Sequence, residues 1–324
     1  MTELENLRSV SARIGADPLL VQAAGGNTSL KQDGVLWIKA SGTWLKDAST
    51  GDIFVPVQLD AMRKGVADHD PRCETCLEFV RKDLNVNGLR PSIETTVHGL
   101  MPQNVVLHVH CVNTIAHAIR MDAESVLSRK LKGFDWAFVP YSRPGLPLGG
   151  AISERLKPGI NVLVLGNHGL VVAADSVTAA ERLLEAVCAA LDLPAVDATA
   201  PKRAELEKIA AGSNYRLANS DEIHAVAMLE DVLHRGRDRV FYPDHVVFLG
   251  EGVATTFENQ PPLVALAGLG TLIHRDAKPA VEPLGRCLAD VLRRVPADAP
   301  LKALNVVELY ALTHWEAEKY RQKI

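Results

Sequence analysis

The segment LHVHCVNTIAH, Leu107 to His117, places two histidines two positions apart inside a run that otherwise has the composition of a buried strand. Residues two apart in a strand face the same side, so His108 and His110 project together while Leu107 and Val109 enter the opposite layer. Neutral imidazole is the commonest metal ligand among protein side chains. The spacing therefore predicts either a chelating pair or two histidines that pack in a core.

A catalytic zinc ion usually takes three protein ligands and keeps one position open, so a third ligand is needed. The best candidate is His168 in LVLGNHGLVV, because Gly166 and Gly169 allow the backbone to bend within an apolar strand. His117 falls in the helix after the pair, and we expect it to pack or to support a ligand. The predicted metal ligands are His108, His110 and His168.

A carboxylate stands ahead of the pair in RPSIETTVHGLMP, residues 90–102. Ser92 is a good N-cap residue after Pro91, which would put Glu94 in the first helical turn and His98 one turn later on the same face. One interpretation is a capped surface helix. The other is that Glu94 points at the metal site and moves a proton there.

A polar stretch with two glycines, AAGGNTSLK, occupies residues 23–31 ahead of the strand that ends in KASGT at residue 43. Its backbone N–H groups and hydroxyls could converge on an anion, although no Walker lysine follows. The alternative is an ordinary polar turn.

The totals set the class of protein. The chain has 324 residues, is 47% hydrophobic and carries a formal net charge of −4. No apolar run approaches the roughly 18 residues of a membrane helix, and the N-terminus lacks the apolar core of a signal peptide. No basic cluster with aromatic residues indicates nucleic-acid binding, and five scattered cysteines do not form a disulfide framework. We expect a soluble, cytoplasmic protein that binds neither membranes nor nucleic acid.

The order of apolar runs predicts an α/β fold. Short, β-branched runs bounded by turn residues predict strands at 36–42, 105–110, 136–141 and 161–173. A helix capped by Ser176 should extend to Pro194. The Pro- and Ala-rich stretch 193–205 predicts a boundary near residue 200. Further strands are expected within 238–252 and 261–276, with LAGLG at 266–270 as an ordinary turn, and a final helix over 306–324.

Five motifs in this order resemble the class II aldolase/adducin family: GGNTS at 25–29, SGT at 41–43, PSIETTVH at 91–98, LHVH at 107–110 and NHGLVV at 167–172. PSIET and YSRPG, residues 141–145, are most similar to the aldolase portion of bifunctional rhamnulose-phosphate aldolase/short-chain dehydrogenase proteins. The dehydrogenase half is missing. The resemblance covers residues 20–190 and becomes thinner afterwards.

The resemblance implies a three-layer α/β/α fold with a central, mainly antiparallel sheet, in a catalytic domain over residues 1–200 with a smaller C-terminal α/β extension over 201–324. It implies Zn²⁺ on the three histidines and Glu94 as the catalytic acid/base. The reaction would be a reversible retro-aldol cleavage of a small ketose or ketose phosphate, through an enediolate that the metal stabilises. It also implies a homo-oligomer, a tetramer, in carbohydrate metabolism.

The same resemblance assigns the substrate phosphate to six residues: Gly26, Asn27, Thr28, Ser41, Gly42 and Ser92. One departure matters, because Ile93 stands where phosphate-using members often carry a second serine. Lys39 and Arg90 could compensate, or could be solvated charges. Aromatic residues near the C-terminus complete the family's sites across a subunit interface, and Tyr310, Trp315 and Tyr320 are candidates that no motif separates.

Two alternatives remain open from the sequence. Decarboxylation of an oxo-tetronate phosphate would use the same site, so the site residues cannot distinguish it from aldol cleavage. An adducin-like scaffold would keep the fold without chemistry. Retention of all three histidines and Glu94 argues against the scaffold.

Overall fold

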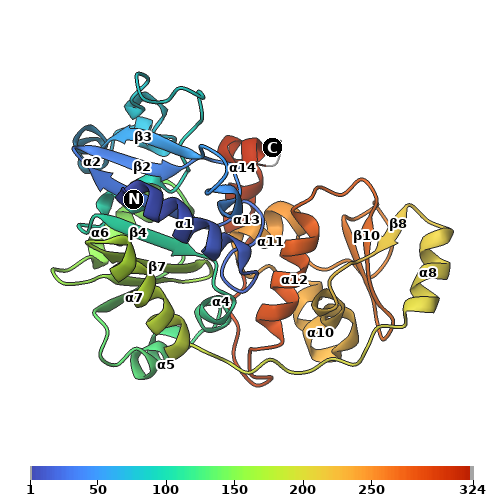
Figure 1. Cartoon of the computed structure of the whole chain (residues 1–324). Coiled ribbons are helices and arrows are strands. Elements are labelled where there is room, and N and C mark those ends of the chain that lie inside the picture. Colours follow the sequence, from blue (N-terminus) through green and yellow to red (C-terminus); the bar gives the residue numbers. More distant parts are fainter. Residues whose placement is uncertain (1, 322–324) are drawn as a thin grey trace.

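A seven-stranded sheet dominates the computed structural model, which describes residues 2–321 (Figure 1). The strands lie in the order β3-β2-β1-β4-β7-β6-β5, and every neighbouring pair is antiparallel except β5 with β6. The strands are β1 Asn27–Gln32, β2 Val35–Lys39, β3 Phe54–Gln58, β4 Val105–Val109, β5 Trp136–Val139, β6 Val162–Leu165 and β7 Gly169–Ala174. The predicted central, mainly antiparallel sheet is confirmed.

Helices cover both faces of this sheet. One face packs against α1 (Glu3–Ala16) and α7 (Val177–Ala190), and the other against α2 (Leu59–Ala67), α3 (Thr95–Leu100) and α6 (Leu146–Arg155). The alternation along β4 accounts for the layers: Leu107 and Val109 belong to the core under α1 and α7, whereas Val106 belongs to the core under α3 and α6. The predicted three-layer α/β/α fold is confirmed.

The predicted interrupted strand over 161–173 is a hairpin. Strands β6 and β7 pair antiparallel with Leu165 opposite Gly169, so the chain reverses direction between them. This reversal puts residues 166–168 next to the C-terminal end of β4, because Val109 pairs with Leu170. The predicted helix α7 begins as expected, since the Ser176 side chain accepts a hydrogen bond from the Ala179 amide.

A second, three-stranded sheet follows, in the order β8-β10-β9. Its strands are β8 Tyr215–Leu217, β9 Leu263–Leu266 and β10 Gly270–His274, and LAGLG forms the predicted turn between β9 and β10. The helices around it are α8 Arg203–Ala211, α9 Ala225–Met228, α10 Glu230–Arg237, α11 Pro243–Leu249 and α12 Val281–Leu292.

Two predictions in this part are wrong. The stretch 238–252 was expected to be a strand but forms α11, with Pro243 in its first turn, where proline is well tolerated. All seven residues of α11 are buried, and a run buried on every side carries no periodicity that distinguishes helix from strand. The expected final helix divides at residues 314–315 into α13 (Val306–Thr313) and α14 (Glu316–Arg321). Residues 322–324 of that prediction lie outside the described residues.

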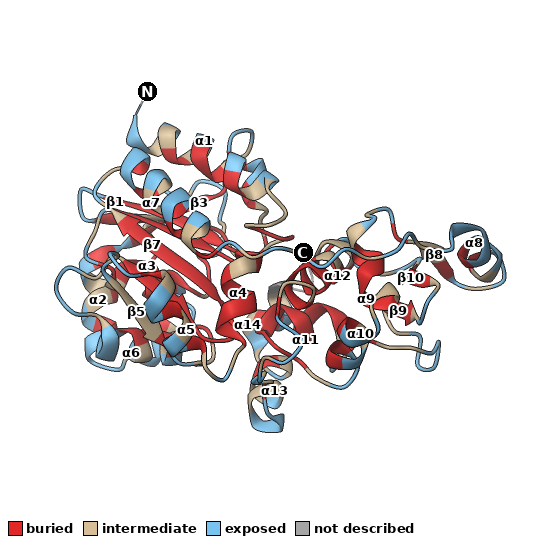
Figure 2. Ribbon diagram, turned by 90° about the horizontal axis from the view of Figure 1, so that it is seen from below, coloured by how far each residue is buried: buried red, intermediate tan, exposed pale blue. Residues whose placement is uncertain are grey.

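The two sheets are joined through a shared core. Helix α4 (Val112–Ala118) follows β4 and leads to α5 (Ala123–Lys130), and its residues Val112, Ile115 and Ala116 pack in one cluster with residues of α11 and α12. Figure 2 shows this buried zone continuing from the sheet through α4 into α11 and α12. Residues 192–202 contain no helix or strand. The boundary at residue 200 stays a prediction.

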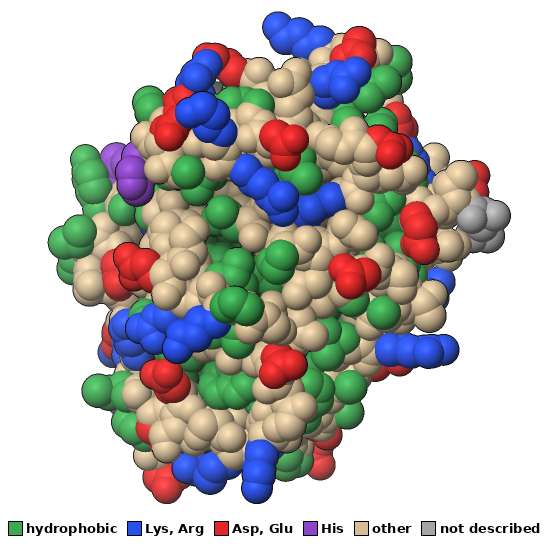
Figure 3. All heavy atoms as spheres, turned by 90° about the vertical axis from the view of Figure 1, so that its left-hand side faces the viewer, with side chains coloured by type: hydrophobic (Ala, Val, Ile, Leu, Met, Phe, Trp, Pro, Cys, Tyr) green, Lys and Arg blue, Asp and Glu red, His purple; other side chains and the backbone are tan. Residues whose placement is uncertain are grey.

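The surface mixes charges of both signs. Figure 3 shows acidic and basic side chains interspersed over the face that carries the large sheet. None of the helices in residues 2–321 has both the length and the apolar content to cross a bilayer.

Candidate functional site

Three buried histidines meet where the central strands β4 and β7 end and begin. His108 lies in β4, His110 directly follows that strand, and His168 ends the turn between β6 and β7. Their ring centroids are 5.0 to 5.2 Å apart, and one nitrogen from each ring lies within 4.8 Å of the others. The structure therefore brings together the three side chains that the sequence predicted as metal ligands.

A hydrogen bond and an ion pair orient two of the rings. His108 Nδ1 lies 3.0 Å from the Leu170 carbonyl oxygen, which can only accept, so Nδ1 carries the proton. His110 Nδ1 lies 2.9 Å from Oδ2 of Asp244, and its Nε2 has no hydrogen-bond partner in the structure. Both rings thus turn Nδ1 toward a protein oxygen, which leaves Nε2 as the nitrogen that could bind a metal.

The backbone around His168 differs from what we expected. The left-handed residue is Asn167 (φ 54°), not either flanking glycine. Asn167 tolerates this conformation, and its side chain donates hydrogen bonds to the carbonyls of Phe241 and Lys302 at 2.9 and 2.7 Å. Gly169 is needed for space instead, because a Cβ there would lie 2.5 Å from the Val109 carbonyl oxygen.

Glu94 borders the same point. Its Oε1 lies 3.3 Å from His108 Nε2 and 3.1 Å from His168 Nε2, and Asn27 Nδ2 donates to its Oε2. Burial alone would raise the pKa of this carboxyl, but His108 and His168 outweigh burial and hold the pKa well below its ordinary value. Glu94 is therefore ionised, at 5% exposure, beside the histidine group.

The local structure that carries Glu94 corrects one expectation. Helix α3 starts at Thr95, and Glu94 itself is the residue before the helix, with φ −99° and ψ 14°. The Ser92 hydroxyl accepts a hydrogen bond from the Glu94 amide at 3.2 Å, so it closes a turn ahead of the helix rather than capping the helix. His98 lies one turn after Glu94, with its amide bonded to the Glu94 carbonyl at 3.3 Å and its Nδ1 at 2.8 Å from the Ser29 hydroxyl.

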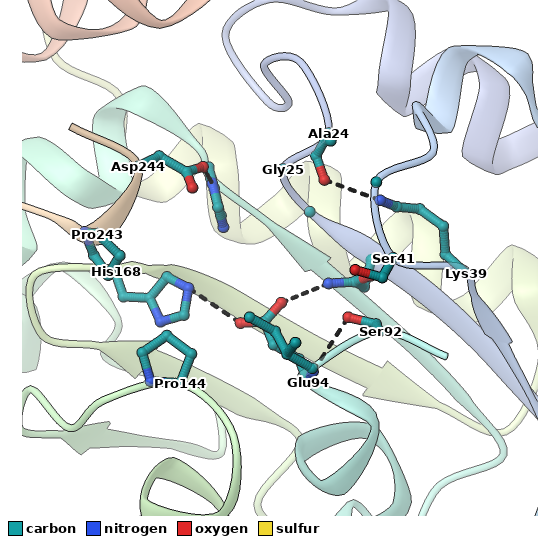
Figure 4. A pocket seen from close by; sticks show the side chains of 15 residues that line it. Ala24, Gly25, Lys39, Ser41, Ser92, Glu94, Pro144, His168, Pro243 and Asp244 are labelled. Atoms are coloured by element: carbon teal, nitrogen blue, oxygen red, sulfur yellow. Dashed lines mark hydrogen bonds and ion pairs between the residues drawn. The ribbon is translucent and has the colours of Figure 1, made fainter. Parts of the chain in front are cut away.

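A small polar pocket opens beside the histidines, with Glu94 in its wall (Figure 4). Five of the six predicted phosphate residues line it: Gly26, Asn27, Ser41, Gly42 and Ser92. Thr28 is the exception. Its hydroxyl lies 2.7 Å from that of Ser11 in α1, because the next residue along a strand faces the opposite layer.

Lys39 also lines this pocket, and the idea that it is a solvated charge is wrong. The side chain is 1% exposed, and Nζ donates to the carbonyls of Ala24 and Thr43 at 2.9 and 2.7 Å (Figure 4). The lysine therefore belongs to the wall of the pocket and not to the solvated surface. Arg90, by contrast, is exposed and stacks over the Tyr320 ring at 4.3 Å.

The pocket volume is about 20 Å³, which is room for one or two water molecules. An adjoining cavity of about 290 Å³ shares Ser41 and Ile93 with it and is closed on another side by Arg90 and by Tyr320 of α14. Of the three candidate aromatic residues, Tyr320 reaches this cavity within its own chain. Trp315 packs under Arg143 at 4.2 Å, and Tyr310 is 64% exposed.

Asp244 is a site residue that was not predicted from the sequence. It lies in the first turn of α11, is 2% exposed, and lines the same pocket together with Pro243. The expected strand over 238–252 concealed it, and no spacing relates it to the three histidines. A lone acidic residue inside an apolar run was the only available signal.

Comparison with known proteins identifies the family. The model of the class II aldolase and adducin N-terminal domain matches residues 9–194, more than half of the chain. The chain belongs to the class II aldolase/adducin family. Among curated proteins it is similar to the uncharacterized oxidoreductase YuxG of Bacillus subtilis, with 28% identity over 180 residues, or 52% of this chain. Because the match covers 26% of that relative, the chain spans about a quarter of its length.

Two solved structures are similar to parts of this chain. The N-terminal class II aldolase domain of a conserved protein from Thermoplasma acidophilum has 25% identity and a TM-score of 0.51, covering 59% of this chain and 92% of that chain. An L-fuculose-1-phosphate aldolase from Thermus thermophilus has 18% identity and a TM-score of 0.36, covering 57% and 92%. The similarity to the Thermoplasma acidophilum domain supports the fold.

Class II aldolases use a divalent metal, and the buried histidine group could hold one. The donor set fits such an ion, because one nitrogen from each of the three rings converges, and the Nε2 atoms of His108 and His168 lie beside the ionised carboxylate of Glu94. Buried, unpaired ring nitrogens are costly unless something binds them.

Proposed function

We propose that this protein is a zinc-dependent class II aldolase that reversibly cleaves a carbon–carbon bond in a small ketose phosphate. One observation supports this most strongly: three buried imidazoles and an ionised, buried Glu94 converge beside a polar, glycine-lined pocket. A homotetramer in the cytoplasm, engaged in carbohydrate metabolism, belongs to the same proposal.

His108, His110 and His168 would hold the cation. When bound, a divalent ion polarises a substrate carbonyl and stabilises the negative charge that forms as the carbon–carbon bond breaks. The side chains need little movement for this role, because Leu170 and Asp244 already orient two of the rings.

Glu94 would move the proton. An ionised carboxylate can take a proton from the carbon next to the substrate carbonyl in the condensation direction, and the same group returns it in cleavage. Asn27 fixes one carboxylate oxygen, Oε2, which leaves Oε1 on the side of the histidines. General acid–base catalysis contributes roughly 10²- to 10⁴-fold to a rate, so loss of Glu94 should nearly abolish turnover.

The pocket wall would bind the phosphate. Gly26, Asn27, Ser41, Gly42 and Ser92 offer hydrogen-bond donors there, and Thr28 would contribute through its backbone alone. Lys39 lines the same wall and would contact the phosphate there, in place of the hydroxyl that Ile93 lacks. Since about 20 Å³ cannot hold a ketose phosphate, the substrate would extend into the adjoining 290 Å³ cavity past Ser41 and Ile93.

The test is product identification. Zinc-loaded protein is incubated separately with ketose 1-phosphates, unphosphorylated ketoses and oxo-acid phosphates, with Glu94→Gln as the inactive control. The proposal predicts two carbonyl products from a ketose phosphate and no reaction with the variant. Carbon dioxide release from an oxo-acid phosphate would identify a decarboxylase instead. Full activity in Glu94→Gln would refute the proton-transfer assignment.

A further inference from the structure

The carboxylate of Asp244 lies against His110 although the two residues come from different parts of the chain. Oδ2 of Asp244 is 2.9 Å from His110 Nδ1, and both side chains are buried, at 2% and 9% exposure. Figure 4 shows Asp244 on the rim of the pocket beside His168, reached from the C-terminal segment. The contact therefore joins α11 of the C-terminal part to the strand end that carries the histidine pair.

This contact favours one tautomer of the ring. A carboxylate oxygen cannot donate, so its 2.9 Å approach to His110 Nδ1 favours the tautomer with the proton on Nδ1 and the lone pair on Nε2. Without that acceptor the ring could take the other tautomer, with the proton on the nitrogen that should bind metal, or could rotate. A carboxylate behind a ligating histidine also makes the ligand nitrogen more basic.

The surrounding packing holds the pair in this geometry. Every residue of α11 is buried, and the helix packs against α12 and α13, so Asp244 has little freedom to withdraw. Gly25 provides the space on the other side. A Cβ at that position would lie 2.8 Å from His110 Nδ1 and 3.2 Å from Asp244 Oδ2, so any larger residue would push the pair apart.

We propose that Asp244 is a positioning residue that orients His110 for metal binding, and that the C-terminal part of the chain thereby completes the metal site. The inference rests on the proposed metal site but not on the aldolase reaction. Asp244 lies outside the aldolase family domain, which covers residues 9–194. The proposal therefore gives residues 201–324 a direct part in the metal site.

The expected effect is a loss of metal affinity. Mutating the partner of a ligating histidine typically costs 10- to 100-fold in affinity. Asp244→Asn keeps the size and an acceptor oxygen but loses the charge, so we expect the lower end of that range. Asp244→Ala removes the acceptor and should reach the upper end. Asp238→Asn is the matched control, because the Asp238 side chain is 77% exposed in the same part of the chain and forms an exposed ion pair with Arg237.

The experiment measures the Zn²⁺ dissociation constant of the metal-stripped, full-length proteins by competition with a fluorescent chelator. Thermal unfolding of the stripped proteins is measured alongside. We expect the affinity order wild type, then Asp244→Asn, then Asp244→Ala, with Asp238→Asn equal to wild type and the stripped Asp244→Asn midpoint within a few degrees of wild type. A purely structural role would lower that midpoint and leave the affinity of the folded fraction unchanged.

Three outcomes overturn the proposal. Asp244 variants that bind Zn²⁺ within twofold of wild type would refute the role of Asp244 while leaving the proposed function intact. A wild-type protein that binds no Zn²⁺ would refute the metal site itself. Should the variants not fold, ¹⁵N NMR of histidine-labelled wild type decides: protonated Nδ1 on His110 supports the inference, and protonated Nε2 contradicts it.

Discussion

Replacing Asn167 should lower the free energy of unfolding, because its side chain joins the turn before His168 to the C-terminal part of the chain. Its side chain donates two hydrogen bonds, to the Phe241 and Lys302 carbonyls, and it is 1% exposed. At about 0.5 to 1.5 kcal/mol each, these bonds account for roughly 1 to 3 kcal/mol. Alanine adds a left-handed strain of about 1 to 2 kcal/mol at φ 54°. Asn167→Ala should therefore lower the free energy of unfolding by about 2 to 5 kcal/mol.

Glycine separates the two contributions. Asn167→Gly loses the hydrogen bonds but adopts the left-handed conformation without strain, so it should be more stable than Asn167→Ala despite glycine's usual entropic cost of about 1 kcal/mol. Urea denaturation, followed by circular dichroism at several protein concentrations, gives both values. Ordinary surface substitutions change the free energy of unfolding by roughly ±0.5 kcal/mol. If both variants stay within that range of wild type, the side chain of Asn167 does not stabilise the protein as described.

Three further predictions concern the pocket, pH and metal removal. Ile93→Ser restores a hydroxyl donor in the wall shared by both cavities, and it should lower KM for a phosphorylated substrate about tenfold while KM for an unphosphorylated one is unchanged, as steady-state kinetics would show. Burial lowers the pKa of His117 to about 4, against an ordinary 6.5. Between pH 6.5 and 4, His117 is therefore protonated in the unfolded chain but not in the folded chain. The free energy of unfolding should fall by up to about 1.4 kcal/mol per pH unit as the pH is lowered through this range. Urea titrations at stepped pH should show a smaller slope for His117→Gln. Chelation of the metal should lower the unfolding free energy by about 2.7 kcal/mol relative to Zn²⁺ at 100 times its dissociation constant, and an unchanged midpoint would contradict binding to the folded state.

The parts of the site that the sequence predicted follow from local geometry. Strand alternation alone places His108 and His110 on one side of β4, with Leu107 and Val109 in the other layer, as the core clusters confirm. The turn at His168 was detectable because glycine and asparagine interrupt an apolar run. In each case a rule that spans a few residues was sufficient.

The parts that the sequence could not predict depend on contacts between distant segments. Asp244 meets His110 across more than a hundred residues, where α11 packs against α12 and α13. Thr28 was assigned to the pocket by motif, although alternation from Asn27 turns its side chain toward Ser11. Ser92 was expected to cap a helix, but α3 begins three residues later.

The central claim is that the three buried imidazoles bind one divalent cation together. The most direct measurement is the zinc content of stripped, reloaded and dialysed protein, compared among wild type and the single variants His108→Ala, His110→Ala and His168→Ala. The account predicts one ion per chain in the wild type and a large loss in each variant. Less than about one ion per three wild-type chains, or full content in any of the three variants, would contradict it.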